Sequence, residues 1–290
     1  MDDAVLNWLL EENEPHIRYR AMRELLGMPR EHPSCIKTRE MLLPALSQTA
    51  DTRWERETKG LWLIYNLVAL AECGLIREDI SVEEAVSRAL EPSFDGGCGD
   101  ALLLRALVML GYGGDERVRQ RLAAFGDTIL PDGGFLCLHR LSKRRDTPKS
   151  CYKANLHAIM LYGECAKRGI GTPGFAALPD YFLQRKIFYR SDAPDALVLD
   201  AREGWRTIDT FHPMEVMRVG VHCVVEALCS LGYGKTAQCE HARLMLDKYK
   251  GENGRYSLAG TLAKSYLPKE RVGKPSKWVT LYALMADKAG

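Results

Sequence analysis

Three cysteines, a histidine and an aspartate lie just before, or at the start of, two apolar stretches of this sequence. They are Cys98, Asp100, Cys137, His139 and Cys151. Zinc in proteins is held by four thiolate, imidazole or carboxylate groups at one point. We therefore consider a zinc site formed by Cys98, Cys137, His139 and Cys151, with Asp100 as a catalytic carboxylate. The alternative is that these cysteines pack as small buried apolar side chains.

Cys151 could also act as a nucleophile. It precedes a predicted helix, and Lys153 follows two residues later. A helix N-terminus and a neighbouring lysine both lower the pKa of a thiol. His157, one to two turns into the same helix, is the candidate base, although a hydrogen-bonded core histidine is the alternative. Lys153 is in addition a candidate ligand-binding residue.

A second group of candidates lies near the starts of the last two apolar stretches. His212, Glu215 and His222 are expected on the fifth predicted apolar helix or just before it, and Trp278 begins the sixth. Glu215 and His222 are seven residues apart and would share a helix face. They could line a cavity together with Trp278, or pack in the core. Asp209 could form an acid–base pair with His212, or cap the helix.

A repeated phrase specifies the elements that position these residues. Leu-Gly-Tyr is followed, 22 positions after its leucine, by Asp-Gly-Gly-aromatic; the clearest copies begin at Leu110, Leu231 and Cys73. Degenerate copies contain Gly27 and Gly169. The first glycine predicts a left-handed helix C-cap, and Asp-Gly-Gly predicts a tight turn. Each unit is therefore expected to be a pair of antiparallel helices.

Apolar and polar predicted helices alternate along the chain. A helix that is apolar nearly all round lies in an interior. We predict an all-α protein with a single domain over residues 1–290: an α/α toroid, or six-hairpin barrel, with the helix at 3–12 as outer partner of the last inner helix. An open solenoid is the alternative. The apolar helices are predicted at 16–26, 58–73, 101–110, 152–166, 213–231 and 277–287, and the polar or mixed ones at 34–47, 82–90, 115–125, 179–189 and 236–249.

Composition limits the partners. The net charge of +2 gives no overall signature of nucleic-acid binding. The sequence contains no uninterrupted run of 18 apolar residues, so we expect no membrane span. Its start is acidic, so we expect no secretory signal. The nine cysteines are irregularly spaced, which favours reduced thiols in the cytoplasm.

The Asp-Gly-Gly-aromatic turns, each followed by an apolar helix, resemble the repeats of the squalene-cyclase and protein-prenyltransferase toroids. The turns that carry this resemblance are Asp132-Gly133-Gly134-Phe135, Asp95-Gly96-Gly97 and Glu203-Gly204-Trp205. The resemblance implies a toroid with a central cavity and, in the enzymes, isoprenoid substrates. The sequence departs from these families, since it has no Asp-x-Asp-Asp acid, and the zinc pair of prenyltransferases, Asp-x-Cys, is reversed here in Cys98-Gly99-Asp100.

Three functions follow from these observations. The first is a cavity protein that binds a small apolar or isoprenoid-like molecule. The second is a zinc-dependent transferase or hydrolase that uses the cysteine and histidine cluster. The third is a helical-repeat scaffold that binds a protein partner without catalysis.

Overall fold

The computed structural model describes most of the chain, and helices are the regular secondary structure of its described part. The chain forms twelve α-helices, three short π- or 3₁₀-helices and isolated β-bridges there, and these described residues contain no β-sheet. The all-α prediction is therefore confirmed. None of the described helices is long and apolar enough to cross a membrane. The described residues are 2–54, 61–92, 94, 96–136, 150–199, 208–262 and 267–290.

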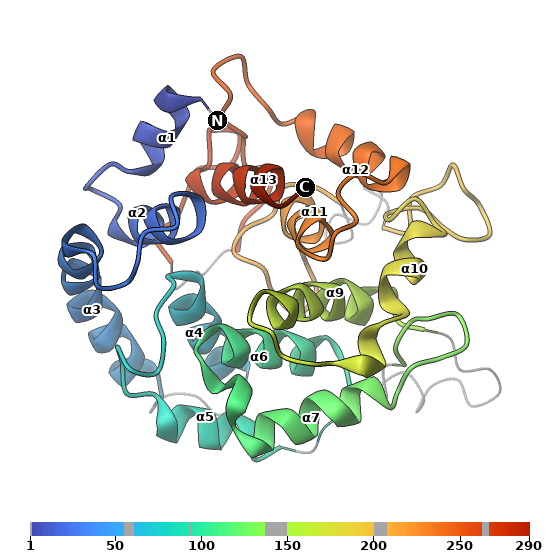
Figure 1. The fold of residues 1–290 in the computed structure, drawn as a ribbon, viewed down its shortest axis with the longest axis horizontal. Coiled ribbons are helices and arrows are strands. Elements are labelled where there is room, and N and C mark those ends of the chain that lie inside the picture. Colours follow the sequence, from blue (N-terminus) through green and yellow to red (C-terminus); the bar gives the residue numbers. More distant parts are fainter. Residues whose placement is uncertain are drawn as a thin grey trace.

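Six largely apolar helices lie around the middle of the molecule (Figure 1). Each of the last five contacts the next one along the chain: α4 contacts α6, α6 contacts α9, α9 contacts α11, and α11 contacts α13. The last of the six, α13, also contacts α2 and its continuation η1. The helices are α2 (Pro15–Arg20), the π-helix η1 (Ala21–Leu25), α4 (Leu61–Glu72), α6 (Cys98–Met109), α9 (Tyr152–Lys167), α11 (Val221–Ser230) and α13 (Lys277–Ala289).

The six other α-helices, which are more polar, lie at the periphery of the same view (Figure 1). Side chains of the residue types that favour helix N-caps begin two of them. Asp115 accepts the amide hydrogen of Arg117 at 2.8 Å at the start of α7, and Thr236 accepts that of Cys239 at 3.3 Å at the start of α12. The peripheral helices are α1 (Asp3–Leu9), α3 (Pro33–Trp54), α5 (Glu83–Leu90), α7 (Glu116–Gly126), α10 (Leu178–Leu183) and α12 (Ala237–Asp247). Two 3₁₀ turns, η2 (Tyr112–Gly114) and η3 (Pro173–Phe175), join them to the inner set.

The repeated phrase forms the turns that the sequence predicts. Its helix-ending glycines all have positive φ, between 64° and 89°. In the Asp-Gly-Gly turn, Gly133 has φ 79°, and the Asp132 carboxylate accepts the amide hydrogen of Gly134 at 3.1 Å. Only glycine adopts such a φ without strain, so the turns end the helices where the phrase occurs. The helix-ending glycines are Gly27, Gly74, Gly111, Gly169 and Gly232.

The aromatic residue of the phrase enters the core. Phe135 is fully buried, with its ring centroid 4.9 Å from that of Phe125 on α7 and 4.8 Å from that of Phe175 in η3. Offset and edge-to-face ring pairs of this kind add to the stabilisation that burial provides. The repeat thus joins consecutive hairpins through its aromatic side chain.

The N-terminal helix contacts the last inner helix, as the sequence predicts. The Lys277 ammonium at the start of α13 lies 5.4 Å from the ring centroid of Trp8 in α1. It also forms ion pairs with Glu11 at 2.7 Å and Glu14 at 3.3 Å, in the connection from α1 to α2. Lys277 is only 3% exposed, so these contacts attach the two ends of the described chain to each other.

Three predicted helix boundaries differ from the observed ones by six or more residues. The fifth inner helix begins at Val221 and not at 213, because the preceding residues bond elsewhere: the amide of His212 donates to Gly260 and that of Val221 to Asp209. Helix α3 continues to Trp54, beyond the predicted end at 47. Helix α10 ends at Leu183, before the predicted 189, since residues 186 and 187 have positive φ.

Candidate functional site

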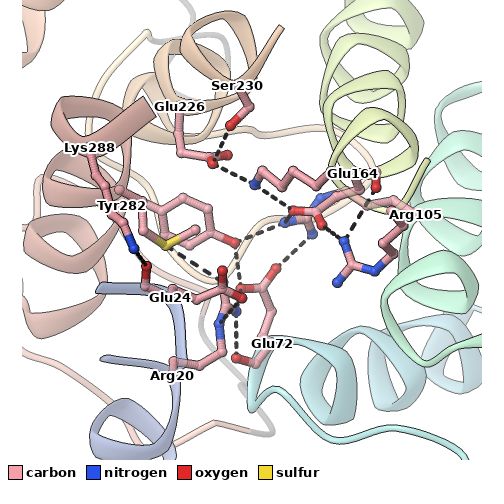
Figure 2. A network of polar contacts seen from close by, with 12 residues as sticks. Arg20, Glu24, Glu72, Arg105, Glu164, Glu226, Ser230, Tyr282 and Lys288 are labelled. Atoms are coloured by element: carbon pink, nitrogen blue, oxygen red, sulfur yellow. Dashed lines mark hydrogen bonds and ion pairs between the residues drawn. The ribbon is translucent and has the colours of Figure 1, made fainter. Parts of the chain in front are cut away.

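Glu72, the last residue of α4, lies at the centre of a buried network of charged side chains (Figure 2). Its carboxylate accepts hydrogen bonds from Arg105 Nη1 and from the Tyr282 hydroxyl, both at 2.7 Å. Arg20 Nη1 donates to the Glu72 carbonyl oxygen at 2.8 Å and lies 3.4 Å from the carboxylate. These four residues are at most 2% exposed. The network joins α2, α4, α6 and α13.

The charges in this network keep one another ionised. Burial alone raises the pKa of Glu72, but Arg105 and Arg20 outweigh burial and the pKa falls to about 2. Burial lowers the pKa of Arg105, whereas Tyr282 and Glu72 raise it, and the net shift is upward. Glu72 is therefore anionic and Arg105 cationic at neutral pH. Removing Glu72 would leave two buried guanidinium groups without their shared counter-ion.

The network continues towards α9 and α11. Glu164 lies 3.9 Å from Arg105 Nη2 and 3.1 Å from Lys167 Nζ, and it also pairs with Arg168. The Lys167 ammonium reaches Glu226 of α11 at 2.5 Å. Every inner helix therefore contributes at least one charged or phenolic side chain to the network, and the cations face carboxylates throughout.

Next to the network lies a group of three aromatic side chains, His212, His222 and Trp278, which we call the histidine cluster. The His212 ring stacks on Trp278 with centroids 4.7 Å apart, and the His222 ring is 6.1 Å from His212. The three residues are 3%, 0% and 1% exposed, respectively. Both ring nitrogens of each histidine and the indole nitrogen of Trp278 have no hydrogen-bond partner among the described residues.

Buried polar atoms in proteins are nearly always hydrogen-bonded, so five such nitrogens on three neighbouring rings are groups that a bound molecule can satisfy. Burial lowers the pKa of His212 to about 4. Burial, together with His212, also lowers the pKa of His222 well below its ordinary value. Both rings are therefore neutral at pH 7, and each offers one N–H donor and one acceptor nitrogen. Trp278 adds a third donor.

The segment at residues 209–219, here called the plug, enters the middle of the molecule from the connection before α11. Its Met214 is 1% exposed, and the Met214 sulfur accepts a hydrogen bond from Arg105 Nη1 at 3.5 Å. The carbonyl oxygen of Val216 lies 3.3 Å from His157 Nε2 of α9. The plug thus contacts both the charged network and an inner helix.

The plug is fixed at its base by Arg218. The Arg218 guanidinium donates to the Asp209 carboxylate at 2.6 Å and lies 4.1 Å from the ring centroid of Phe211. The sequence hypothesis that Asp209 pairs with His212 is therefore wrong, because Arg218 is the partner of that carboxylate. A cavity of about 20 Å³ lies beside the plug. Its lining residues are Tyr65, Val68, Ala69, Pro213, Met214, Leu262 and Leu267.

The structure brings together two of the four predicted zinc ligands. Cys98 and Cys151 pack in one small cluster with Ala154, whereas Cys137 and His139 lie outside the described residues. In the described part of the chain, no group of three or more histidine, cysteine, aspartate or glutamate side chains is placed to bind a metal ion. The zinc site therefore stays a prediction.

The other predicted residues have identifiable surroundings. Asp100 accepts the amide hydrogen of Gly97 at 3.4 Å and lies 3.5 Å from Arg121, which are contacts of a helix cap. His157 is buried with a pKa lowered by burial to about 4, so it matches the alternative of a hydrogen-bonded core histidine. Glu215 belongs to the plug and not to a helix, so it does not share a helix face with His222, contrary to the prediction. Burial raises the pKa of Glu215, partly offset by Arg218 and by Lys153 on α9.

Sequence reasoning missed the charged network. The available signal was a charged residue within an otherwise apolar run, such as Arg105 in ALLLRALVM or Glu226 in VHCVVEALCS. A charge at such a position is almost never fully buried unless it is paired. Several of them on consecutive inner helices therefore predict a shared network, which the repeat pattern alone does not reveal.

A larger hollow, of about 640 Å³, lies between α6, α7 and the turn after α9. Six of its lining residues are glycines, and Arg168 is the member of its lining that also belongs to the charged network. We call it the glycine groove. Its volume is ligand-sized, but the histidine cluster is not part of its lining. Its lining comprises Val108, Gly111, Gly113, Gly114, Arg119, Leu122, Ala123, Gly126, Asp127, Arg168, Ile170, Gly171, Thr172, Pro173, Gly174 and Phe175.

Comparisons of the chain with protein-family models, curated proteins and solved structures found no match. Inferences about function therefore rest on the chain's own residues.

Proposed function

We propose that this chain is a closed α/α toroid that binds a small, mostly apolar molecule with one uncharged polar group at its centre. The closed arrangement is supported by the contacts of α13 with α2 and η1, and by the ion pairs of Lys277 with Glu11 and Glu14. Binding is supported chiefly by one observation, the five unpartnered ring nitrogens of the histidine cluster.

The chemistry of the cluster selects the ligand's polar group. The two neutral imidazoles and the Trp278 indole offer three N–H donors and two acceptor nitrogens, which suits a hydroxyl or carbonyl group. A charged group fits less well, because the neighbouring cations and carboxylates already pair with one another and an added buried charge would be uncompensated. An isoprenoid alcohol has the required chemistry and agrees with the toroid resemblance of the repeats.

The apolar part of the ligand takes the space between the plug and α4. The cavity there, about 20 Å³, is too small for such a molecule. Binding therefore requires Pro213 and Met214 to leave the positions that line the cavity, while His212 stays stacked on Trp278. A ligand that binds the open arrangement alone shifts the population of the protein towards it.

The experiment measures the melting temperature of the purified protein with and without farnesol, a fifteen-carbon isoprenoid alcohol. Ligand at about 100 times its Kd adds roughly 2.7 kcal/mol of stability, which is a shift of several degrees for a chain of this length. We expect His222→Phe to abolish the shift while it keeps the ring volume, and Trp278→Phe to reduce it.

The matched control is Gly114→Trp, which fills the glycine groove. The position of a Cβ on Gly114 has no heavy atom within 4 Å, so this variant should fold and retain the farnesol shift. Loss of the shift in Gly114→Trp, but not in folded His222→Phe, would move the site to the groove. No shift in the wild-type protein would refute binding of this ligand class.

A further inference from the structure

Two buried cysteines from adjacent helices face each other away from the histidine cluster. Cys229 Sγ in the last turn of α11 lies 4.0 Å from Cys239 Sγ in the first turn of α12. The residues are 1% and 0% exposed, and both are free thiols. A disulfide has an S–S distance of about 2.05 Å, so the sulfurs need to approach by roughly 2 Å.

The local structure favours a thiolate in this pair. Cys239 is the third residue of an eleven-residue helix, and its amide hydrogen is bonded to the cap residue Thr236 at 3.3 Å. The Cys229 sulfur lies 4.0 Å from that of Cys239 and therefore close to the positive end of the α12 dipole, which stabilises a thiolate. The hydrogen bond from Cys239 lowers the pKa of Cys229 against burial, which raises it, and the Arg243 guanidinium, one turn after Cys239, also lowers it. The same hydrogen bond and burial raise the pKa of Cys239, so that sulfur keeps its proton. One sulfur can thus be the nucleophile while the other stays a donor.

We propose that Cys229 and Cys239 are a redox modification site, which a hydroperoxide converts into an intramolecular disulfide between α11 and α12. The Cys229 thiolate attacks one peroxide oxygen, the O–O bond breaks, and a sulfenic acid forms as the other oxygen leaves as hydroxide or alkoxide. The Cys239 sulfur then attacks the sulfenic sulfur. The S–S bond forms, the S–O bond breaks, and hydroxide leaves and takes up the thiol proton as water. With hydrogen peroxide, two thiols and one peroxide give one disulfide and two waters.

The disulfide restrains the helix that contains His222 and Glu226. It attaches the C-terminal end of α11 to the outer helix α12 on the far side of the turn at residues 231–236. Because both thiols are buried, the oxidant reaches them through local opening of this turn. Oxidation is therefore expected to be slower than that of an exposed thiol, and a dithiol reductant reverses it.

The experiment treats the folded protein with hydrogen peroxide, blocks the remaining thiols with an alkylating reagent after denaturation, and maps the peptides by mass spectrometry. We expect one cross-linked peptide pair joining residues 229 and 239, with a loss of about 2 Da for the two hydrogens removed. Dithiothreitol should restore both free thiols.

Three variants test the assignment. Cys229→Ser and Cys239→Ser should each abolish the cross-link, whereas Cys165→Ser, which removes a buried thiol on α9, should leave it unchanged. Circular dichroism of each variant shows that it is folded. A cross-link that forms only in urea, or that joins other cysteines in the folded wild-type protein, would overturn the proposal, and the wild-type map gives this result even if a variant does not fold.

Discussion

Replacing Glu72 by glutamine tests whether the buried network fixes the inner helices in place. The side chain keeps its size and can still accept a hydrogen bond, but its charge is lost. Arg105 at 2.7 Å and Arg20 at 3.4 Å then lack their shared counter-ion in a site where all three residues are at most 2% exposed. Removing one partner of a buried ion pair typically costs about 3–5 kcal/mol, which is a large part of the 5–15 kcal/mol that stabilises an ordinary domain.

The exposed ion pair of Glu83 with Arg117 provides the matched control. Its atoms are 2.8 Å apart, but the two side chains are 61% and 42% exposed. Solvent screens such a pair, so Glu83→Gln should cost less than about 1 kcal/mol. The assay is urea unfolding of both variants at pH 7, with the free energy of unfolding extrapolated to water. A Glu72→Gln cost within about 1 kcal/mol of the Glu83→Gln cost would refute the reasoning.

Three further predictions concern single residues. Burial lowers the pKa of His212 to about 4, against about 6.5 in the unfolded chain. The stability that neutral His212 provides is therefore complete above pH 6.5 and is lost as the pH falls towards 4. In His212→Phe, the plot of unfolding free energy against pH should be less steep in this range, by up to about 1.4 kcal/mol per pH unit. Gly133→Ala should cost more than Gly273→Ala in thermal unfolding, because both glycines have positive φ but only at Gly133 would the new Cβ lie 2.9 Å from the Ala177 carbonyl oxygen; equal costs would contradict the predicted steric clash. Tyr282→Phe removes a buried hydrogen bond to a carboxylate and should cost about 1.5–3 kcal/mol in urea unfolding, whereas a cost below about 0.5 kcal/mol would show that the bond contributes little.

The repeated phrase allowed most of the helices to be predicted, because it records local backbone requirements. Glycine at a left-handed helix end, such as Gly111 or Gly232, and aspartate bonded to its own turn, such as Asp132, depend on neighbours within a few residues. Alternation of apolar and polar helices likewise identified the inner and peripheral sets. These signals are local or periodic, so they can be read from a single sequence.

The plug could not be predicted by the same reasoning. Residues 213–220 are mostly compatible with a helix that begins at a proline, and the apolar pattern continues into α11. The choice against a helix depends on distant partners: the His212 amide bonds to Gly260, and Thr210 accepts amide hydrogens from Ala259 and Gly260. Contacts across some fifty residues of sequence leave no periodic signal. For that reason the predicted shared face of Glu215 and His222 was wrong.

The position of the plug also explains why the candidate site combines groups that sequence reasoning had kept apart. His212 comes from the plug, His222 from the first turn of α11 and Trp278 from the first turn of α13, so the cluster exists only while the plug is inserted. Moving Pro213 and Met214 outward would remove Met214 from Arg105, while His212 stays stacked on Trp278. In the proposed function, ligand binding and the integrity of the charged network are therefore coupled through one short segment. A ligand that uses the nitrogens of the histidine cluster must supply enough contact free energy to replace the packing of Met214, which favours a molecule with a substantial apolar body over a small polar one.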